Sequence, residues 1–137
     1  MEKLTFVKIT HETIQPELAL EAVRHPSCGA VVSFEGRIRS ENQGESVAGL
    51  AYEVYEKMFY TEVEKIYSEI LKNWDIHQLA LIQRVGKLNV GDMGIFIAVS
   101  SAHRREAFEA CACAIEEFKK RVPVWKKEFG AASEKWI

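Results

Sequence analysis

A helical repeat of apolar side chains between residues 57 and 74 limits the fold more than any other feature of the sequence. The repeat steps by three or four residues, which is the spacing of one face of an α-helix. Its members are Phe59, Val63, Ile66, Ile70 and Trp74. A helix with one apolar face is stable when that face is buried against another element. We therefore predict a helix over residues 57–74 that packs onto the core.

A second long helix is predicted after Ser101. Its apolar positions again step by three or four residues, and they are Phe108, Cys111, Ile115, Phe118 and Val122. Pro123 ends this helix, because proline has no backbone N–H to donate. A shorter helix is predicted over residues 16–24, where Pro16 suits the first helical turn.

The other apolar segments predict strands, because β-branched and aromatic residues concentrate there. These segments are residues 3–10, 29–39, 47–55, 79–85 and 95–100. The polar residues 40–46 predict an exposed, mobile loop, which favours a hairpin between the strands on either side of it. Residues 86–92 contain turn-forming glycines. They lack the Gly-Lys-Ser/Thr ending of a phosphate loop and no helix follows directly, so we interpret them as a plain turn.

Strands mixed with helices, and a helix closing the chain, predict an α+β fold: a two-layer arrangement of helices on a mainly antiparallel sheet. The 137 residues, 47% of them hydrophobic, suit one domain over residues 1–137. The N-terminal residues alternate polar and apolar, unlike a signal peptide, and no segment approaches a membrane span. Three cysteines cannot all pair with one another, which agrees with a reducing compartment. We therefore expect a cytoplasmic protein.

No metal site is predicted from the sequence. Cys111 and Cys113 lie about 200° apart around a helix, so they cannot share a metal ion or a disulfide. Cys111 falls on the apolar face and is interpreted as a core residue. The histidines also lack the spacing of metal ligands; they are His11, His25, His77 and His103.

Positive charge is concentrated around Pro123. Five of the 18 Lys and Arg residues lie in the segment Lys119–Lys127, and without them the net charge of −2 would be −7. Crowded lysines lower each other's pKa, and a partly neutral lysine can exchange a proton near neutral pH. The alternative is that Lys119 and Lys120 only complement the helix C-terminus. Because Pro123 interrupts the helix, spacing leaves open whether Lys119 and Lys126 converge.

The start of the second long helix carries another group of cations. His103, Arg104 and Arg105 occupy a first turn whose partial positive charge normally favours acidic residues. Such a cluster, together with free backbone amides, suits a bound phosphate. Alternatively, Arg105 pairs with Glu109 four residues on, and the other two face solvent.

Two arginines mark the end of the strand predicted over residues 29–39. Arg37 and Arg39 are two residues apart and therefore share a face of the strand. They either join the other cations around an anion or merely protect an edge strand. The sequence contains no Gly-x-Ser-x-Gly elbow or other marked nucleophile, so the nucleophile of an enzyme would come from elsewhere.

Four motifs resemble those of the large, catalytic subunit of molybdopterin synthase. They are Phe34-Glu-Gly-Arg-Ile-Arg39, Val85-Gly86-x-Leu-x-x-Gly91-Asp92, Val99-x-Ser-Ala-His-Arg104 and Lys119-x-Arg-x-Pro-x-Trp-Lys126. The resemblance covers essentially the whole chain, with the motifs in the same order. It implies an α+β fold with a hammerhead-like β element.

The resemblance also implies an activity. In that family, sulfur passes from the C-terminal thiocarboxylate of a small ubiquitin-like partner subunit to cyclic pyranopterin monophosphate, forming the dithiolene of molybdopterin. The partner's sulfur would be the missing nucleophile, and the cations would stabilise anionic groups in the pocket. The family assembles as a homodimer of large subunits within a heterotetramer, and the resemblance implies no bound metal and no cofactor.

Carried over by position, Lys119 is the expected residue for proton transfer and charge stabilisation, and Lys126 is the second choice. The expected substrate-binding residues are Arg37, Arg39, His103, Arg104 and Arg121. Of these, His103 and Arg104 are expected to serve the neighbouring protomer. The chain stops at Ile137, where family members usually continue, so the contribution of a longer tail to the pocket is left open.

Two other functions are compatible with the sequence. A noncatalytic module could use the basic segment and Trp125 to bind single-stranded nucleic acid through phosphate contacts and stacking. That function predicts RNA binding that weakens steeply with salt. A purely structural dimer with solubilising cations is disfavoured, because the cations cluster at a helix start and around a proline.

Overall fold

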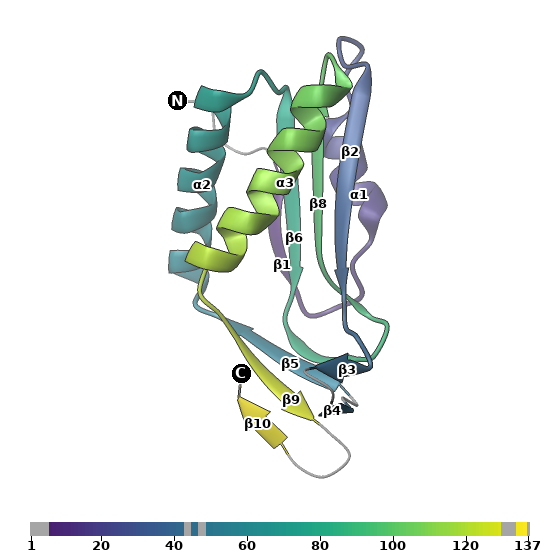
Figure 1. Cartoon of the computed structure of the whole chain (residues 1–137), viewed down its shortest axis with the longest axis vertical. Helices are drawn as coiled ribbons and strands as arrows, with labels where there is room; N and C mark the ends of the chain where they lie inside the picture. Colours follow the sequence, from purple (N-terminus) through teal and green to yellow (C-terminus); the bar gives the residue numbers. More distant parts are fainter. Residues whose placement is uncertain (1–5, 43–44, 47–48, 130–133, 137) are drawn as a thin grey trace.

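The computed structural model describes residues 6–42, 45–46, 49–129 and 134–136 (Figure 1). Its helices are α1 (Pro16–Val23), α2 (Glu56–Asn73) and α3 (Arg104–Arg121). Its strands are β1 (Phe6–Thr10), β2 (Ala30–Arg37), β3 (Glu41–Asn42), β4 (Glu45–Ser46), β5 (Gly49–Val54), β6 (Gln78–Arg84), β7 (Gly86–Asn89), β8 (Met93–Ser101), β9 (Val124–Phe129) and β10 (Glu134–Trp136). The expected α+β class is confirmed.

The main sheet has the strand order β1-β6-β8-β2. Strand β1 runs parallel to β6, and the other neighbours are antiparallel. Helices α2 and α3 lie side by side over one face, as Figure 1 shows, and α1 covers the other. The arrangement therefore has three layers, and the predicted two-layer arrangement is wrong.

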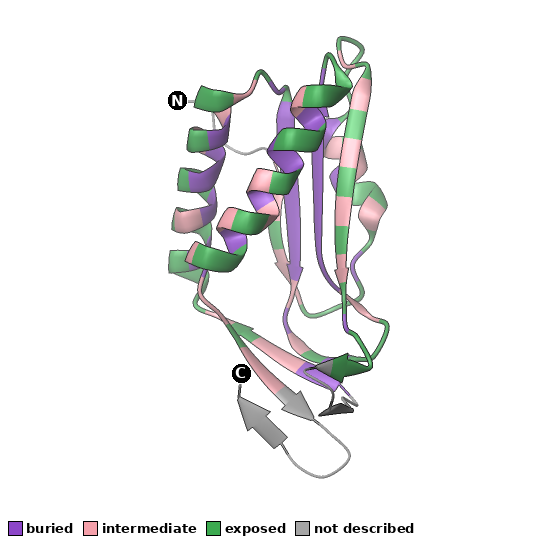
Figure 2. Cartoon of the chain, viewed as in Figure 1, coloured by how far each residue is buried: buried purple, intermediate pink, exposed green. Residues whose placement is uncertain are grey.

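The central strands explain the third layer. Alternate side chains of β6 and β8 point to opposite faces of the sheet. Leu81 and Ile97 belong to the core cluster under α2 and α3, whereas Ala80, Ile82 and Ala98 belong to the cluster under α1. Both strands are accordingly buried along nearly their whole length (Figure 2). A strand apolar on both faces needs cover on both sides, which the sequence periodicity alone did not reveal.

The two long helices form where the sequence predicts them. In α2 the predicted residues Phe59, Val63, Ile66 and Ile70 are buried, and Trp74 follows directly as the C-cap. Helix α3 ends at Arg121, two residues before Pro123, as expected. One predicted core residue is wrong: Phe108 is 61% exposed.

Small residues take the place of Phe108 on the buried face of α3. Ala107, Ala110 and Ala114 are at most 3% exposed and lie with Cys111 and Phe118 against the sheet. Alanines let the helix backbone approach the strands closely, so the buried stripe is rotated away from the one that the large residues suggest.

A second sheet, with strand order β10-β9-β5-β7, lies beyond the end of the main sheet (Figure 1). Strand β5 pairs antiparallel with both β7 and β9. The predicted hairpin between residues 29–39 and 47–55 is therefore wrong, because β2 and β5 belong to different sheets. Strands β9 and β10 follow α3, so a helix does not close the chain.

The two segments predicted as a loop and a turn both contain short strands. Within the predicted loop 40–46, β3 and β4 pair with each other, while residues 43–44 lie outside the described residues. The predicted turn 86–92 contains the short strand β7, which joins the second sheet. Leu88 explains this pairing, because it is fully buried in a small core with Ile38 and Leu50.

Candidate active site

A cleft of about 420 Å³ lies where α3, the end of the main sheet and the second sheet meet. Its apolar lining includes Phe34, Ile38, Leu50, Ile95, Ile115, Phe118, Val122 and Val124. Four of the predicted site residues line it as well: Arg37, Arg39, Lys119 and Lys126. The volume falls in the range of small-molecule sites. The cleft is therefore lined by apolar side chains and by four cations, which come from β2, the segment after β2, α3 and β9.

Three neighbouring cations in the last turn of α3, Lys119, Lys120 and Arg121, have different surroundings. Lys119 lines the cleft and is exposed, with no ion pair or hydrogen bond to the rest of the described chain. Lys120 points elsewhere and pairs with Glu117 at 3.5 Å. The helical repeat puts Ile115 and Lys119 on one face, since they are four residues apart. Both of them line the cleft.

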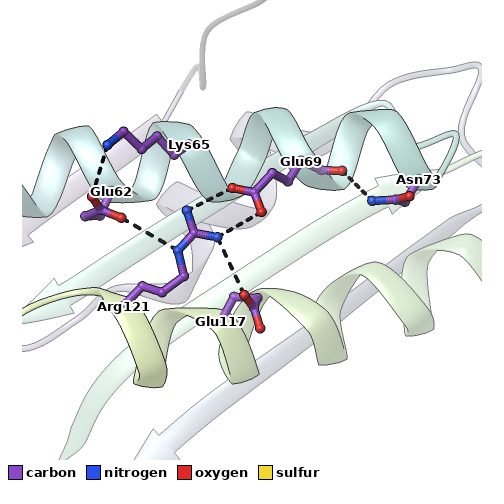
Figure 3. Close-up of polar contacts among 6 residues, drawn as sticks. All are labelled: Glu62, Lys65, Glu69, Asn73, Glu117 and Arg121. Atoms are coloured by element: carbon purple, nitrogen blue, oxygen red, sulfur yellow. Dashed lines mark hydrogen bonds and ion pairs between the residues drawn. The ribbon is translucent and has the colours of Figure 1, made fainter.

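Arg121 ties α3 to α2 (Figure 3). It is not among the residues that line the cleft. Its guanidinium contacts Glu69 twice, with Nη2 at 2.8 Å from one carboxylate oxygen and Nη1 donating to the other at 2.9 Å. Its Nε lies 3.6 Å from Glu62, and Nη1 lies 3.5 Å from Glu117. The hydrogen bond from Arg121 lowers the pKa of Glu69. The position of Arg121 suits a link between two helices and lends no support to its predicted part in substrate binding.

Strand β9 brings Lys126 to the same cleft as Lys119, a convergence that their spacing in the sequence could not establish. Pro123 ends the helical geometry, and β9 then runs antiparallel to β5 with Lys126 opposite Tyr52. Alternation along β9 brings Val124 and Lys126 to the cleft. Trp125, between them, is 52% exposed and is not among the cleft residues.

Arg37 is held by local contacts at the end of β2. Its Nη1 donates to the Gly91 carbonyl at 2.7 Å, and its Nη2 donates to the Glu35 carboxylate at 3.2 Å. Because β2 is an edge strand of the main sheet, Arg37 also fits the alternative of edge protection. Arg39 is exposed, lines the cleft, and has no ion pair or hydrogen bond within the described residues. Arg39 is thus the freer of the two to meet a ligand.

The glycine-containing turn secures this end of β2. Gly86 and Gly91 have φ angles of 91° and 89°, in the left-handed region that favours glycine. The Asp92 carboxylate accepts a hydrogen bond from the Asn89 N–H at 2.9 Å. Backbone bonds of 2.8 and 2.9 Å join Ile38 to Gly91 and Asp92. The interpretation as a turn without a phosphate-binding role fits these contacts, and the turn fixes the backbone between Arg37 and Arg39.

His103 is the N-cap of α3 and Arg104 is its first residue, so both lie at the opposite end of this helix from Lys119. Lys119 follows Arg104 by fifteen residues, or about 22 Å along a helix axis. Both His103 and Arg104 are exposed. Arg105 pairs with Glu109 at 3.0 Å, as the alternative interpretation of this turn proposed. Within one chain, these residues do not join the cleft.

Several cleft residues were not predicted from the sequence. Tyr52 and Gly94 face each other across the two sheets, while Gln83 and Glu41 add polar groups to the lining. Burial raises the pKa of the Tyr52 hydroxyl above its usual value. Strand alternation puts Leu50 and Tyr52 on one face of β5, but only the partner strands reveal that this face is the wall of a cleft.

The chemistry of the cleft follows from what lines it. Four cations above apolar side chains favour negative charge, and this stabilisation grows when a bound ligand excludes water from the cleft. The described lining contains no Cys, Ser or His side chain. In the part of the chain that the structure describes, no three His, Cys, Asp or Glu residues are grouped to hold a metal ion. None of the described helices is long and apolar enough to cross a membrane.

Fold and cleft together define an α+β protein with a cationic cleft whose described lining contains no Cys, Ser or His side chain. Comparison with known proteins identifies the family. A model of the MoaE protein family matches residues 9–121. The molybdopterin synthase catalytic subunit of Pyrococcus abyssi is 44% identical over 135 residues, covering 98% of this chain and 90% of that protein. The chain therefore belongs to the MoaE family, the catalytic subunits of molybdopterin synthase.

Solved structures give the same result for the fold. The crystal structure of molybdopterin synthase from Staphylococcus aureus matches with a TM-score of 0.90 at 37% identity, covering 94% of each chain. A structure described as the complex of subunits 1 and 2 of molybdopterin-converting factor from Helicobacter pylori 26695 shares the fold, with a TM-score of 0.78 at 22% identity. That match covers 95% of this chain and 88% of the other.

Proposed function

We propose that this protein transfers sulfur from the C-terminal thiocarboxylate of a small ubiquitin-like partner subunit to cyclic pyranopterin monophosphate, forming the dithiolene of molybdopterin. The observation that carries the proposal is the convergence of Arg37, Arg39, Lys119 and Lys126 on one cleft whose described lining has no Cys, Ser or His. Such a cleft suits a reaction in which the nucleophile is brought in by an anionic guest.

The partner's tail has the chemistry that this cleft accepts. A thiocarboxylate and a phosphate are both anions, and an extended chain end needs only a narrow entry. In each transfer the thiocarboxylate sulfur bonds to a carbon of the pterin substrate as an oxygen substituent leaves that carbon. Water then cleaves the resulting thioester, which leaves the sulfur on the pterin and an ordinary carboxylate on the partner. The H. pylori protein of the same fold is described as a complex of two subunits, which supports a small-subunit partner for this chain.

The residues differ in their proposed roles. Lys119 meets the reacting end of the tail, where its ammonium stabilises developing negative charge and exchanges a proton. Lys126 assists from β9, which also lines the cleft. Arg39 binds the anionic part of the pterin substrate. Arg37 contributes charge from a fixed position, because it is already bonded to Gly91 and Glu35.

The assembly belongs to the same proposal. We propose a homodimer within a heterotetramer, in which His103 and Arg104 complete the site of the neighbouring protomer. Both side chains are exposed and distant from the cleft of their own chain, which agrees with that arrangement. We equate the second sheet with the hammerhead-like β element. A single domain over residues 1–137 and a cytoplasmic location complete the proposal.

Reconstitution tests the function directly. The purified protein is mixed with a thiocarboxylated small subunit and cyclic pyranopterin monophosphate, and the dithiolene product is detected by mass. A matched reaction contains the same small subunit with an ordinary C-terminal carboxylate. Product in the first reaction and none in the second is expected. Absence of product in both, with both proteins folded, would contradict the proposed activity.

The nucleic-acid alternative is not favoured. Its cations should follow an open surface together with Trp125, so that bases stack while phosphates are neutralised. Four of the cations instead line a concave cleft from which Trp125 is absent. Retention of RNA at low salt that weakens steeply as salt rises would restore this alternative.

A further inference from the structure

Tyr52 occupies the middle of the cleft wall on β5. Its backbone is opposite Lys126 on β9 and opposite Gly86 on β7. The side chain is half-buried and packs against the small core of Ile38, Leu50 and Leu88. Tyr52 therefore has a fixed base in the second sheet and a ring that reaches the cleft.

Gly94 on β8 makes room for this ring. A Cβ atom at position 94 would lie 2.9 Å from Cε2 of Tyr52 and 3.4 Å from its hydroxyl oxygen. The first distance is shorter than ordinary carbon–carbon contacts, so any larger residue would push the ring away. The Tyr52 ring thus bridges the two sheets where Gly94 of the main sheet leaves space for it.

Lys126 lies over the same ring. Its Nζ is 5.8 Å from the centre of the Tyr52 ring, within the range of an attractive cation–π contact. Burial raises the pKa of the Tyr52 hydroxyl, so the ring is neutral at physiological pH. A lysine side chain has many rotamers, and a contact that restrains it lowers the entropy lost when it meets a ligand.

We propose that Tyr52 is a positioning residue, whose ring, given room by Gly94, seats the Lys126 ammonium over the cleft. This inference rests on the proposed sulfur transfer for its consequence in catalysis, but the contact itself does not depend on that function. Tyr52 acts on Lys126, and it does so with its aromatic ring. Its hydroxyl is not required.

Substitutions separate the ring from the hydroxyl. Tyr52→Phe keeps the ring and should retain most of the sulfur-transfer turnover. Tyr52→Leu removes it and should lower kcat about two- to fivefold, the effect of losing one partly exposed cation–π contact. Tyr55→Leu is the matched control, because Tyr55 is 57% exposed and is not among the cleft residues. Loss of turnover in Tyr52→Phe as large as in Tyr52→Leu would overturn the proposal.

A double-mutant cycle shows whether Tyr52 acts through Lys126. In a Lys126→Ala background, replacing Tyr52 by Leu should change kcat by less than about 1.5-fold, because the interaction is already gone. A merely structural role for the ring would give the same loss in both backgrounds. That result would contradict the inference.

An NMR measurement keeps this inference separate from the proposed function. In the wild-type protein, the ε-methylene protons of Lys126 should resonate upfield, because their carbon is bonded to the Nζ that lies over the Tyr52 ring. The signal, identified by its absence in Lys126→Ala, should move downfield in Tyr52→Leu and stay in place in Tyr52→Phe. An unchanged signal in Tyr52→Leu would remove the proposed contact even if sulfur transfer is observed. A changed signal without sulfur transfer would refute only the proposed function.

Discussion

Replacing Phe118 by alanine removes the aromatic ring that joins α3 to α2 beneath the cleft. Phe118 is 6% exposed and belongs to the main core. Its ring meets the fully buried Phe59 edge-on, with centroids 5.8 Å apart and planes at 78°. The substitution therefore leaves a cavity and also breaks an aromatic pair.

The size of the effect follows from burial. Phe→Ala substitutions in protein cores cost about 3–5 kcal/mol, the sum of lost apolar transfer and the cavity left behind. Domains of this size are stable by about 5–15 kcal/mol, so the Phe118→Ala protein should lose a large share of its stability. Phe108→Ala provides the control on the same helix. Because Phe108 is 61% exposed, its removal should change stability by no more than about 0.5 kcal/mol.

Urea denaturation followed by tryptophan fluorescence measures both variants. A lower midpoint with an unchanged slope reports a loss of stability in the folded state. The Phe59–Phe118 pair can be isolated by a cycle of leucine substitutions, which should give a coupling of about 0.5–1.5 kcal/mol. If Phe118→Ala and Phe108→Ala were equally destabilised, the assignment of the buried face of α3 would be refuted.

Three further predictions concern charge, backbone and thiol chemistry. The hydrogen bond from Arg121 lowers the pKa of Glu69, so the pair stabilises the fold above the pH at which Glu69 titrates in the unfolded chain, and this stabilisation is lost as pH falls through the folded-state pKa. In urea titrations, Arg121→Met should therefore destabilise the protein more at about pH 7 than at about pH 3.5, and an equal loss at both would contradict the assignment. Gly91→Ala should cost about 1–2 kcal/mol in thermal or urea unfolding, because a φ of 89° strains any residue with a Cβ; an unchanged midpoint would argue against that geometry. Burial raises the pKa of the Cys111 thiol to about 11, so roughly one thiol in a thousand is ionised at pH 8, and alkylation by iodoacetamide should be far slower at Cys111 than at Cys28; equal rates would count against its burial.

The features predicted well from sequence are those set by local chemistry. The repeat of Phe59, Val63, Ile66 and Ile70 marks the buried face of α2, because helix geometry alone determines which residues share a face. Pro123 ends α3 for an equally local reason, the missing backbone donor. The exposure of Phe108 shows the limit of such reasoning. A pattern of large residues cannot reveal that a stripe of alanines packs closer to the sheet.

The features missed from sequence depend on which strands pair. Lys119 and Lys126 converge because β9 pairs with β5. In the sequence β5 follows β2 after the short strands β3 and β4, yet β5 and β2 belong to different sheets. No residue near Lys119 encodes that register. Tyr52 and Gly94 were missed for the same reason, since their contact joins two sheets. Arg121 shows the converse, because this cation, two residues after Lys119, serves a helix–helix link.

The most direct test of the central claim compares two adjacent lysines. Lys119 lines the cleft, whereas Lys120 pairs with Glu117 outside it, and both are exposed. Sulfur transfer is measured in single turnover for Lys119→Ala and Lys120→Ala, with thiocarboxylated small subunit in excess. Lys119→Ala should react about a hundredfold or more slowly, as expected for loss of a proton-transfer group, and Lys120→Ala should react at nearly the wild-type rate. Equal rates in the two variants would contradict the assignment of the cleft as the reaction site.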